Sequence, residues 1–228
     1  VDQFGSIGGM YIPLAVLAVV ALLFLKFVPE GPAAQEHHGD GQAGSLALPI
    51  TGLVAMLIWC CGLGAVWTFV ERIGVDGGLE SALALRSLSV SSAVAITGAL
   101  AAAALAAKGV GRFLPVTIAL AGQMAVAWFI QGEMSWVELA IKASIFQVFW
   151  NMTGPFIMGA IAASDTRGKV AVLIPAAQTS GFFIGPAIAG QFMAEAGLSA
   201  ANLTAIVCCG IALIIFIPLS ARLKAAGV

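Results

Sequence analysis

Long apolar runs separated by short polar connections fill most of this chain. The runs are continuously apolar rather than alternating, which predicts helices and not the strands of a membrane barrel. A bilayer core about 30 Å thick requires about 20 apolar residues per helix, and the runs have about that length. We therefore predict an all-α membrane protein with seven transmembrane helices. The expected spans are Met10–Val28, Leu46–Val70, Ala82–Ala107, Phe113–Gln131, Val137–Ala163, Val170–Met193 and Ala201–Ala221.

The composition favours lipid over water as the surrounding solvent. Hydrophobic residues make up 61% of the 228 residues and charged residues only 9%, with a mean hydropathy of +1.04. Because a water-soluble domain carries about 25% charged residues, we expect the lipid bilayer to be the chain's first partner. The net charge is −1 without a basic or acidic block, which favours no nucleic-acid partner.

The four cysteines form two adjacent pairs inside apolar runs, Cys60-Cys61 and Cys208-Cys209. Neighbouring side chains on a helix point in different directions, and no metal-binding spacing such as CxxC occurs. The cysteines are therefore expected to be small packing residues. The chain is expected to hold no metal and no cofactor.

Basic residues cluster on every second connection between the runs. The cytoplasmic connections of membrane proteins carry the excess of Lys and Arg. The pattern therefore predicts a multi-pass protein of the inner (plasma) membrane whose C-terminus is cytoplasmic. The other three basic residues, Arg72, Arg86 and Lys142, lie on or near the opposite connections, each with an acid nearby. The clustered residues are Lys26, Lys108, Arg112, Arg167, Lys169, Arg222 and Lys224.

The longest polar stretch, residues 29–45, divides the chain into a single helix, residues 1–28, and a six-helix domain, residues 46–228. Its Gly, Pro, Gln and His content is typical of a flexible linker. His37 and His38 stand side by side within it. A solvated pair is favoured over a metal or proton role, because no further ligand lies nearby in sequence.

The six-helix domain divides into two sets of three runs. Trp67 and Trp150 occupy similar segments 83 residues apart, whereas the third and sixth runs begin 88 residues apart, as do the fourth and seventh. Since each set has an odd number of spans, the second set must be inverted in the membrane. Inverted three-helix repeats are typical of secondary transporters, whose substrate site lies between the repeats near the midplane.

Two segments extend this comparison to a family. Residues 108–112 (KGVGR) resemble the Gly/Arg-rich cytoplasmic motif of major facilitator superfamily transporters, although they lack its acidic residue and most of its basic ones. Residues 175–190 resemble the eleventh helix of that family, which glycines and prolines punctuate. The chain as a whole resembles the C-terminal half of such a transporter plus the helix before it.

This resemblance implies a place for each segment. Residues 1–28 would be the sixth helix of the family, residues 29–45 the loop between the halves, and the other runs helices seven to twelve. The family's first five helices would then lie upstream of Val1 or on a separate complementary half. On that expectation this polypeptide alone does not transport.

In the family, helices seven, eight, ten and eleven line the substrate cavity. On the matching runs we expect substrate-binding side chains at Trp67, Gln147, Trp150, Asn151 and Gln178. Amides in lipid need partners, which a water-filled cavity or hydrogen bonds between helices would supply. Cavity lining is favoured for Gln147 and Asn151, which are four residues apart on one helix face. The tryptophans would stack on an aromatic substrate or serve as packing residues.

Three charged residues are candidates for proton coupling. Glu71 and Arg72 end the seventh-helix run, and Arg86 lies near the start of the eighth. The alternative for Glu71 and Arg72 is a solvated ion pair at the surface. Arg86 could instead extend toward water or pair with Glu80, and an anion-binding role is the third alternative.

The chain contains no Ser/His/Asp set, HExxH motif or phosphate-binding loop, so we expect no enzymatic activity. The predicted function is secondary active transport of a small molecule by alternating access, with H⁺ as coupling ion, in drug or metabolite efflux or uptake. The few charges on the cavity-lining runs favour a neutral, lipophilic or aromatic substrate. A seven-helix receptor or scaffold without transport is the alternative. A retinal protein is disfavoured because the last run lacks a central lysine.

Overall fold

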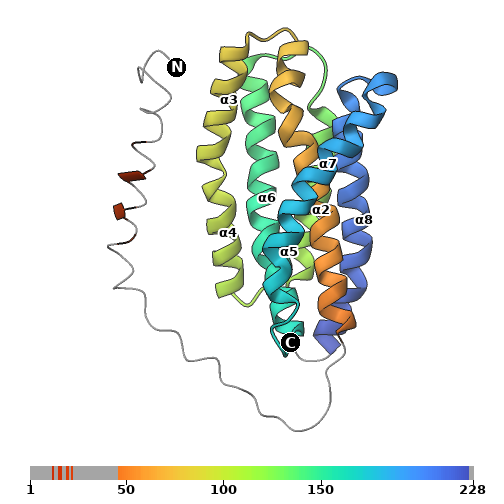
Figure 1. Ribbon diagram of the computed structural model, residues 1–228. Coiled ribbons are helices and arrows are strands. Elements are labelled where there is room, and N and C mark those ends of the chain that lie inside the picture. The colour runs from red at the N-terminus through yellow and green to blue at the C-terminus, as the bar shows by residue number, and fades with distance from the viewer. Residues whose placement is uncertain (1–11, 13–14, 17–18, 21, 23–45, 226–228) are drawn as a thin grey trace. The chain divides into compact units, whose positions relative to one another are not determined.

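The computed structural model of the chain describes residues 46–225, together with residues 12, 15–16, 19–20 and 22 (Figure 1). The chain divides into two units, residues 1–43 and 44–228. The first expected span and the linker at residues 29–45 lie almost wholly outside the described residues, so both remain predictions. The second unit is described continuously to Ala225 and consists of helices and their short connections.

Each of the last six predicted runs forms a helix or a pair of helices end to end. The α3 and α4 helices follow one another across Ala95 and together make one span, 81–107. Five spans are long and apolar enough to cross a membrane, whereas α5 is apolar but only 17 residues long. The helices are α2 (Ala47–Asp76), α3 (Ser81–Val94), α4 (Ile96–Ala107), α5 (Phe113–Phe129), α6 (Trp136–Ser164), the short 3-10 helix η2 (Ala171–Leu173), α7 (Ile174–Ala196) and α8 (Ser199–Ala225).

Two helix ends differ from the hydropathy pattern for identifiable reasons. The α2 helix continues six residues past Val70, through charged side chains, and stops at the Gly77-Gly78 pair, where Gly78 has φ +93°. The α5 helix ends two residues before the predicted end, because Ile130 leaves helical geometry at φ −82°, ψ 71°. The Ile130 carbonyl there accepts a hydrogen bond from the buried amide of Asn202 on α8.

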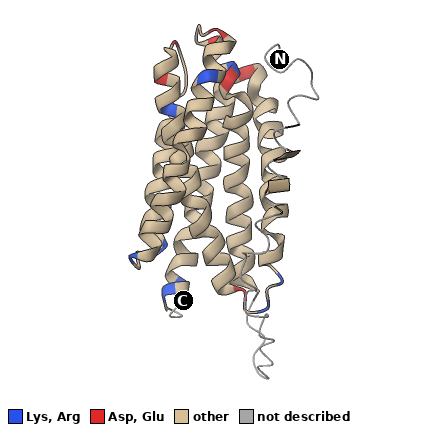
Figure 2. Cartoon of the chain, turned by 90° about the vertical axis from the view of Figure 1, so that its left-hand side faces the viewer, with Lys and Arg blue, Asp and Glu red and all other residues tan. Residues whose placement is uncertain are grey.

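Charged side chains gather at the two ends of the bundle and leave its middle apolar (Figure 2). Among the described residues, one end carries the basic set Lys108, Arg112, Arg167, Lys169, Arg222 and Lys224, with Asp165 as its acid. The other end carries the acidic set Glu71, Asp76, Glu80, Glu133, Glu138 and Glu195, with Arg72, Arg86 and Lys142. The predicted alternation of basic connections therefore corresponds to a basic end and an acidic end of one bundle.

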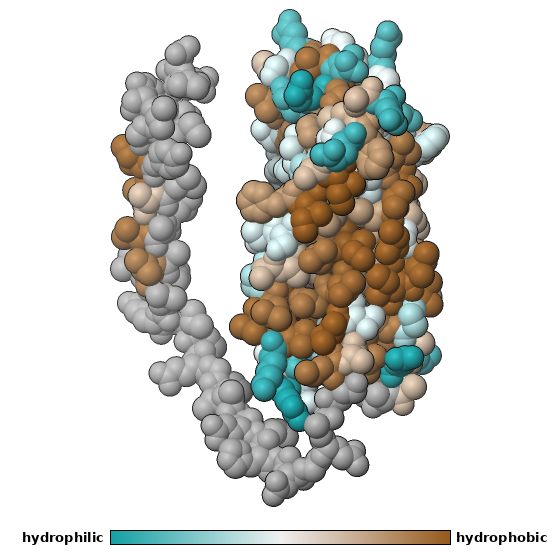
Figure 3. All heavy atoms as spheres, turned by 45° about the vertical axis from the view of Figure 1, so that its right-hand side comes forward, coloured by the Kyte–Doolittle hydropathy of each residue, from teal (hydrophilic) through white to brown (hydrophobic). Residues whose placement is uncertain are grey.

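The surface between these ends is made of large apolar side chains (Figure 3). Leu100 is 64% exposed, Phe183 is 73% exposed and Ile214 is 69% exposed, and they lie on three different helices. A soluble monomer rarely leaves such a wide apolar surface open to water. Lipid contact explains this surface, since hydrocarbon solvates these side chains without cost.

Two helices form the centre of the bundle. The α2 helix packs along α7 and α8, and α6 packs along the α3–α4 span and along α5. The α2 and α6 helices also contact each other, as do α5 and α8. Large side chains from the two central helices, including Trp59, Leu63, Phe146 and Ile157, are fully buried there.

Glycine allows the closest of these helix contacts. A Cβ at Gly185 would lie 1.9 Å from the backbone oxygen of Cys61, and one at Gly181 would lie 2.6 Å from the oxygen of Leu57. The two glycines have the GxxxG spacing that permits close contact between membrane helices. At the other central helix, α6, a Cβ added to Gly98 of α4 would lie 2.2 Å from the backbone oxygen of Val148.

We predict that Gly185→Ala destabilises the bundle, because the new methyl group meets the backbone of α2 rather than a movable side chain. Overpacking of this kind costs about 1–3 kcal/mol, and the backbone obstacle puts it toward the upper value. Gly190→Ala on the same helix is the matched control, because a Cβ there meets no atom within 4 Å. Thermal unfolding in detergent should show a lower midpoint for Gly185→Ala alone, and equal midpoints would contradict the contact.

Candidate functional site

An aromatic cluster lies where the two central helices meet α7. The ring of Trp150, halfway along α6, meets that of Trp67 on α2 edge-on at a centroid distance of 5.9 Å. The same ring lies 5.4 Å from that of Phe182 on α7. All three side chains are half-buried, so the cluster opens on the surface of the bundle. Phe182 was not among the predicted site residues. It reaches Trp150 because the neighbouring Gly181 brings α7 close to α2, a contact between helices that the sequence pattern does not show.

Gln147 is held by the neighbouring α3 helix. Its side-chain nitrogen donates hydrogen bonds to the hydroxyl oxygens of Ser91, at 2.9 Å, and Ser92, at 3.3 Å. Its side chain is 6% exposed. Gln147 therefore has the interhelical partners that sequence analysis weighed against cavity lining, and its amide nitrogen is already satisfied.

Asn151 and Gln178 have more hydrogen-bonding capacity left. The Asn151 amide nitrogen donates to the Gln147 carbonyl on its own helix, at 2.9 Å. Neither the side-chain oxygen of Asn151 nor any side-chain atom of Gln178 has a hydrogen bond with the residues that the structure describes. Both residues are half-buried. The Gln147 side-chain oxygen likewise has no hydrogen bond with the described residues, but Gln147 is only 6% exposed. Asn151 and Gln178 are therefore the more accessible amides of the predicted set.

Trp59 has a structural partner. Its indole N–H donates to the side-chain oxygen of Gln123 on α5, at 2.9 Å, and both residues are at most 1% exposed. The burial of Trp59 removes its ring from any surface that a substrate can reach. Its hydrogen bond explains the single amide in the interior of α5.

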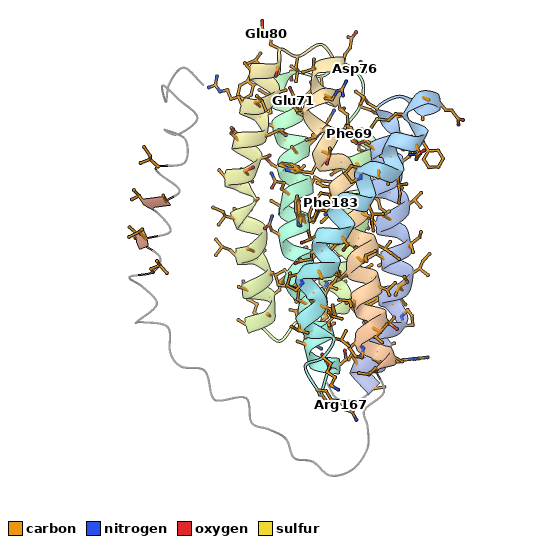
Figure 4. The ribbon with its side chains drawn as sticks, viewed as in Figure 1. Phe69, Glu71, Asp76, Glu80, Arg167 and Phe183 are labelled. Atoms are coloured by element: carbon orange, nitrogen blue, oxygen red, sulfur yellow. The ribbon has the colours of Figure 1, made fainter. Side chains whose placement is uncertain are left out.

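Glu71 lies at the acidic end of the bundle (Figure 4), and Arg72 and Arg86 belong to the charged set of the same end. Glu71 is half-buried and its carboxylate accepts a hydrogen bond from the Ser81 hydroxyl at 2.7 Å, which ties the end of α2 to the start of α3. Arg72 is exposed. The other carboxylates of this end are exposed, so Glu71 is the least solvated acid in its set.

Arg86 packs against an aromatic ring. Its guanidinium lies 5.2 Å from the centroid of the Trp136 ring, at the start of α6. A cation over a tryptophan face is stabilised by the ring's quadrupole. Within the described chain Arg86 has no ion pair with Glu80, and this stacking takes its place.

One ordered site at the basic end was missed by sequence reasoning. The Asp165 carboxylate accepts hydrogen bonds from the backbone N–H groups of Val170, at 2.6 Å, and Ala171, at 2.7 Å, just before α7. Partial burial alone would raise the pKa of this carboxyl, but the surrounding backbone N–H groups lower the pKa below its ordinary value. Asp165 therefore fixes the turn between α6 and α7 as an anion.

Comparison of the chain with models of known protein families, with curated proteins and with solved structures gives no match.

Asp165→Asn should destabilise the bundle at neutral pH by about 1–2 kcal/mol, the usual cost of losing a capping side chain. Because folding lowers this pKa, the stabilisation is present above the ordinary pKa of about 3.9. It is lost as pH falls through the folded value. Unfolding midpoints of the two proteins should thus differ at pH 7 and converge in acid. Glu195→Gln, an exposed carboxyl at the other end, is the control, and a gap independent of pH would contradict the charge role.

Proposed function

We propose that this chain is part of a secondary active transporter of the major facilitator type, which moves a small molecule by alternating access. The observation that carries the proposal is a correspondence between the two halves of the six-helix domain. Exchanging α2 with α6, the α3–α4 span with α7, and α5 with α8 turns the packing of α2 on α7 and α8 into that of α6 on the α3–α4 span and α5. The exchange leaves the α2–α6 and α5–α8 packings unchanged, whereas the α7–α8 packing has no counterpart of similar extent. Such a correspondence is what two copies of an inverted three-helix unit produce.

The closest contacts support the same correspondence residue by residue. Gly185 meets Cys61 on α2, and Gly98 meets Val148 on α6. The two glycines are 185 − 98 = 87 positions apart, and their partners are 148 − 61 = 87 positions apart. This offset agrees with the 88-residue spacing of the runs. The 87-residue offset is longer by about one helical turn than the 83 residues between Trp67 and Trp150. The two tryptophans are therefore better interpreted as residues in contact than as the same position in the two repeats.

A second pair of contacts follows nearly the same offset. A Cβ at Gly122 on α5 would lie 2.2 Å from the Phe149 ring on α6. The equivalent positions, 87 residues away, are Cys209 on α8 and Gly62 on α2. A Cβ at Gly62 would lie 3.0 Å from the Cβ of Cys208, which is adjacent to Cys209. Two independent glycine contacts thus favour a duplicated three-helix unit.

The aromatic cluster is the proposed substrate site. In transporters built from inverted repeats the substrate binds between the repeats near mid-depth, and Trp150 lies halfway along α6 beside residues of α2 and α7. Trp67, Trp150 and Phe182 offer aromatic faces. Asn151 and Gln178 offer free amide groups, and the cluster contains no charged side chain. These groups favour a neutral substrate with an aromatic ring and a few polar atoms.

The charged ends of the bundle favour one orientation in the membrane. We propose that the basic end, with the C-terminal end of α8, faces the cytoplasm of an inner membrane, as the excess of Lys and Arg there favours. Single cysteines introduced at Lys108 and Arg167 should then both react with a membrane-impermeant maleimide from the cytoplasmic side only. The native cysteines within the described chain are buried and unbridged, which keeps the background reaction low.

The transport proposal predicts that Asn151→Ala and Gln178→Ala each lower flux about twofold to tenfold, the range expected for one lost hydrogen bond to a ligand. Flux is measured in membrane vesicles from cells that express the complete gene, with a panel of labelled neutral aromatic compounds. Thr179→Ala is the control, because Thr179 is exposed and bonds only to the Pro175 carbonyl of its own helix. Binding of a compound without flux in either direction would support the receptor alternative instead.

Glu71 is the proposed carrier of the coupling proton. Glu71→Gln should abolish the stimulation of flux by an imposed pH gradient, while exchange of labelled for unlabelled substrate at equal pH continues. Glu80→Gln, an exposed acid at the same end, should keep the stimulation. A Glu71→Gln protein that still responds to the gradient would rule this carboxyl out as the coupling group.

A further inference from the structure

A cavity lies at the basic end of the bundle, and none of its lining residues belongs to the aromatic cluster. Its volume is about 780 Å³, within the range of small-molecule sites. The end of α4, the 109–112 connection, the start of α5, the second half of α6 and the end of α8 form its walls. The proposed transport mechanism makes no use of this cavity.

Two cations line the cavity, and no acid does. Arg112 reaches across to α6, where a Cβ at Gly159 would lie 3.9 Å from the Arg112 Nε atom, and Lys224 enters from the last turn of α8. Neither side chain has a hydrogen bond or ion pair with the described residues. Asp165, the acid of this end, does not line the cavity, and its Oδ2 atom accepts hydrogen bonds from the backbone N–H groups of Val170 and Ala171. The cavity therefore favours an anion.

The remaining lining is mostly hydrocarbon. Phe113, Leu114, Phe156 and Leu223 contribute apolar side chains to the same cavity. A free phosphate ion would gain nothing from these walls, whereas a molecule with both an anionic head and an acyl chain would use both parts. The cavity also lies at the end of helices that are long and apolar enough to cross a membrane. A lipid headgroup would occupy that level, and basic pockets between helices on the cytoplasmic side suit such headgroups.

We propose that the cavity between α4, α5, α6 and α8 binds one anionic phospholipid, with Arg112 and Lys224 on its phosphate and the four apolar side chains along its acyl chain. This site is separate from the aromatic cluster and does not depend on the transport proposal. It requires only that the bundle lie in a membrane.

The test is binding of phosphatidylglycerol to the purified full chain in detergent, measured by native mass spectrometry. Phosphatidylcholine serves as the lipid without net charge. Phosphatidylglycerol should bind more tightly, and Arg112→Gln and Lys224→Gln should each weaken its binding about fivefold, the expected effect of one charge near a lipid phosphate. Neither change should affect phosphatidylcholine. Arg222→Gln is the matched control, because Arg222 lies on the last turns of α8 but does not line the cavity.

A second variant separates the cavity from its charge. Gly159→Leu keeps both cations, fills the space beside Arg112 and should also weaken phosphatidylglycerol binding, while thermal unfolding reports whether each variant is folded. Glycerol phosphate and inorganic phosphate are the competing soluble anions. If either displaces the lipid at similar concentrations, the site is one for soluble anions and the proposal fails. It fails equally if both lipids bind alike, or if folded Arg112→Gln and Lys224→Gln proteins behave like Arg222→Gln.

Discussion

The whole arrangement depends on two places where a helix backbone lies directly against a neighbouring backbone. Gly185 and Gly181 seat α7 on α2, and Gly98 seats α4 on α6. In lipid there is little hydrophobic drive to bring helices together, so association depends on close packing and on hydrogen bonds between helices. Because glycine has no side chain at these points, α2 and α6 become the central helices. The aromatic cluster and the Gln147–Ser91 bond form where these central helices meet their neighbours.

The helical class and the order of the helices between residues 47 and 225 could be predicted because the bilayer imposes a length on each apolar run. Helix ends could not, because they depend on groups that hydropathy ignores. The α2 helix runs on through Glu71 and Arg72 until a glycine pair stops it. The α6 helix is the exception, because it begins at a capping box of Ser135 and Glu138, which has a recognisable sequence pattern. The end of α5 depends on Asn202, 72 residues along the chain, and no local pattern could reveal it.

The site residues likewise have some features that local spacing predicts and others that depend on residues far away in the chain. The shared face of Gln147 and Asn151 could be read from their spacing of four residues. Which of the two is already occupied could not, because the Ser91 partner lies 56 residues away on another helix. The hydrogen bond between Trp59 and Gln123 also joins residues far apart in the chain, 64 positions, so the sequence does not reveal it either. The GxxxG pair on α7 was recognisable, whereas Gly98 stands in a weaker small-residue pattern with Ala102 and acquires meaning only from its contact with Val148.

The polar side chains inside the bundle fall into two groups: those that hydrogen-bond to another helix, and those that keep unused donors or acceptors. Gln147 and Trp59 are buried and bonded to other helices, so their loss would first weaken packing. Asn151 and Gln178 are half-buried and keep unused donors or acceptors near the half-buried rings of the aromatic cluster. An unsatisfied amide at such depth is costly unless water or a ligand reaches it. Such amides favour an aqueous space or another helix bundle beside the surface between α2, α6 and α7, as the proposed alternating-access cavity would provide.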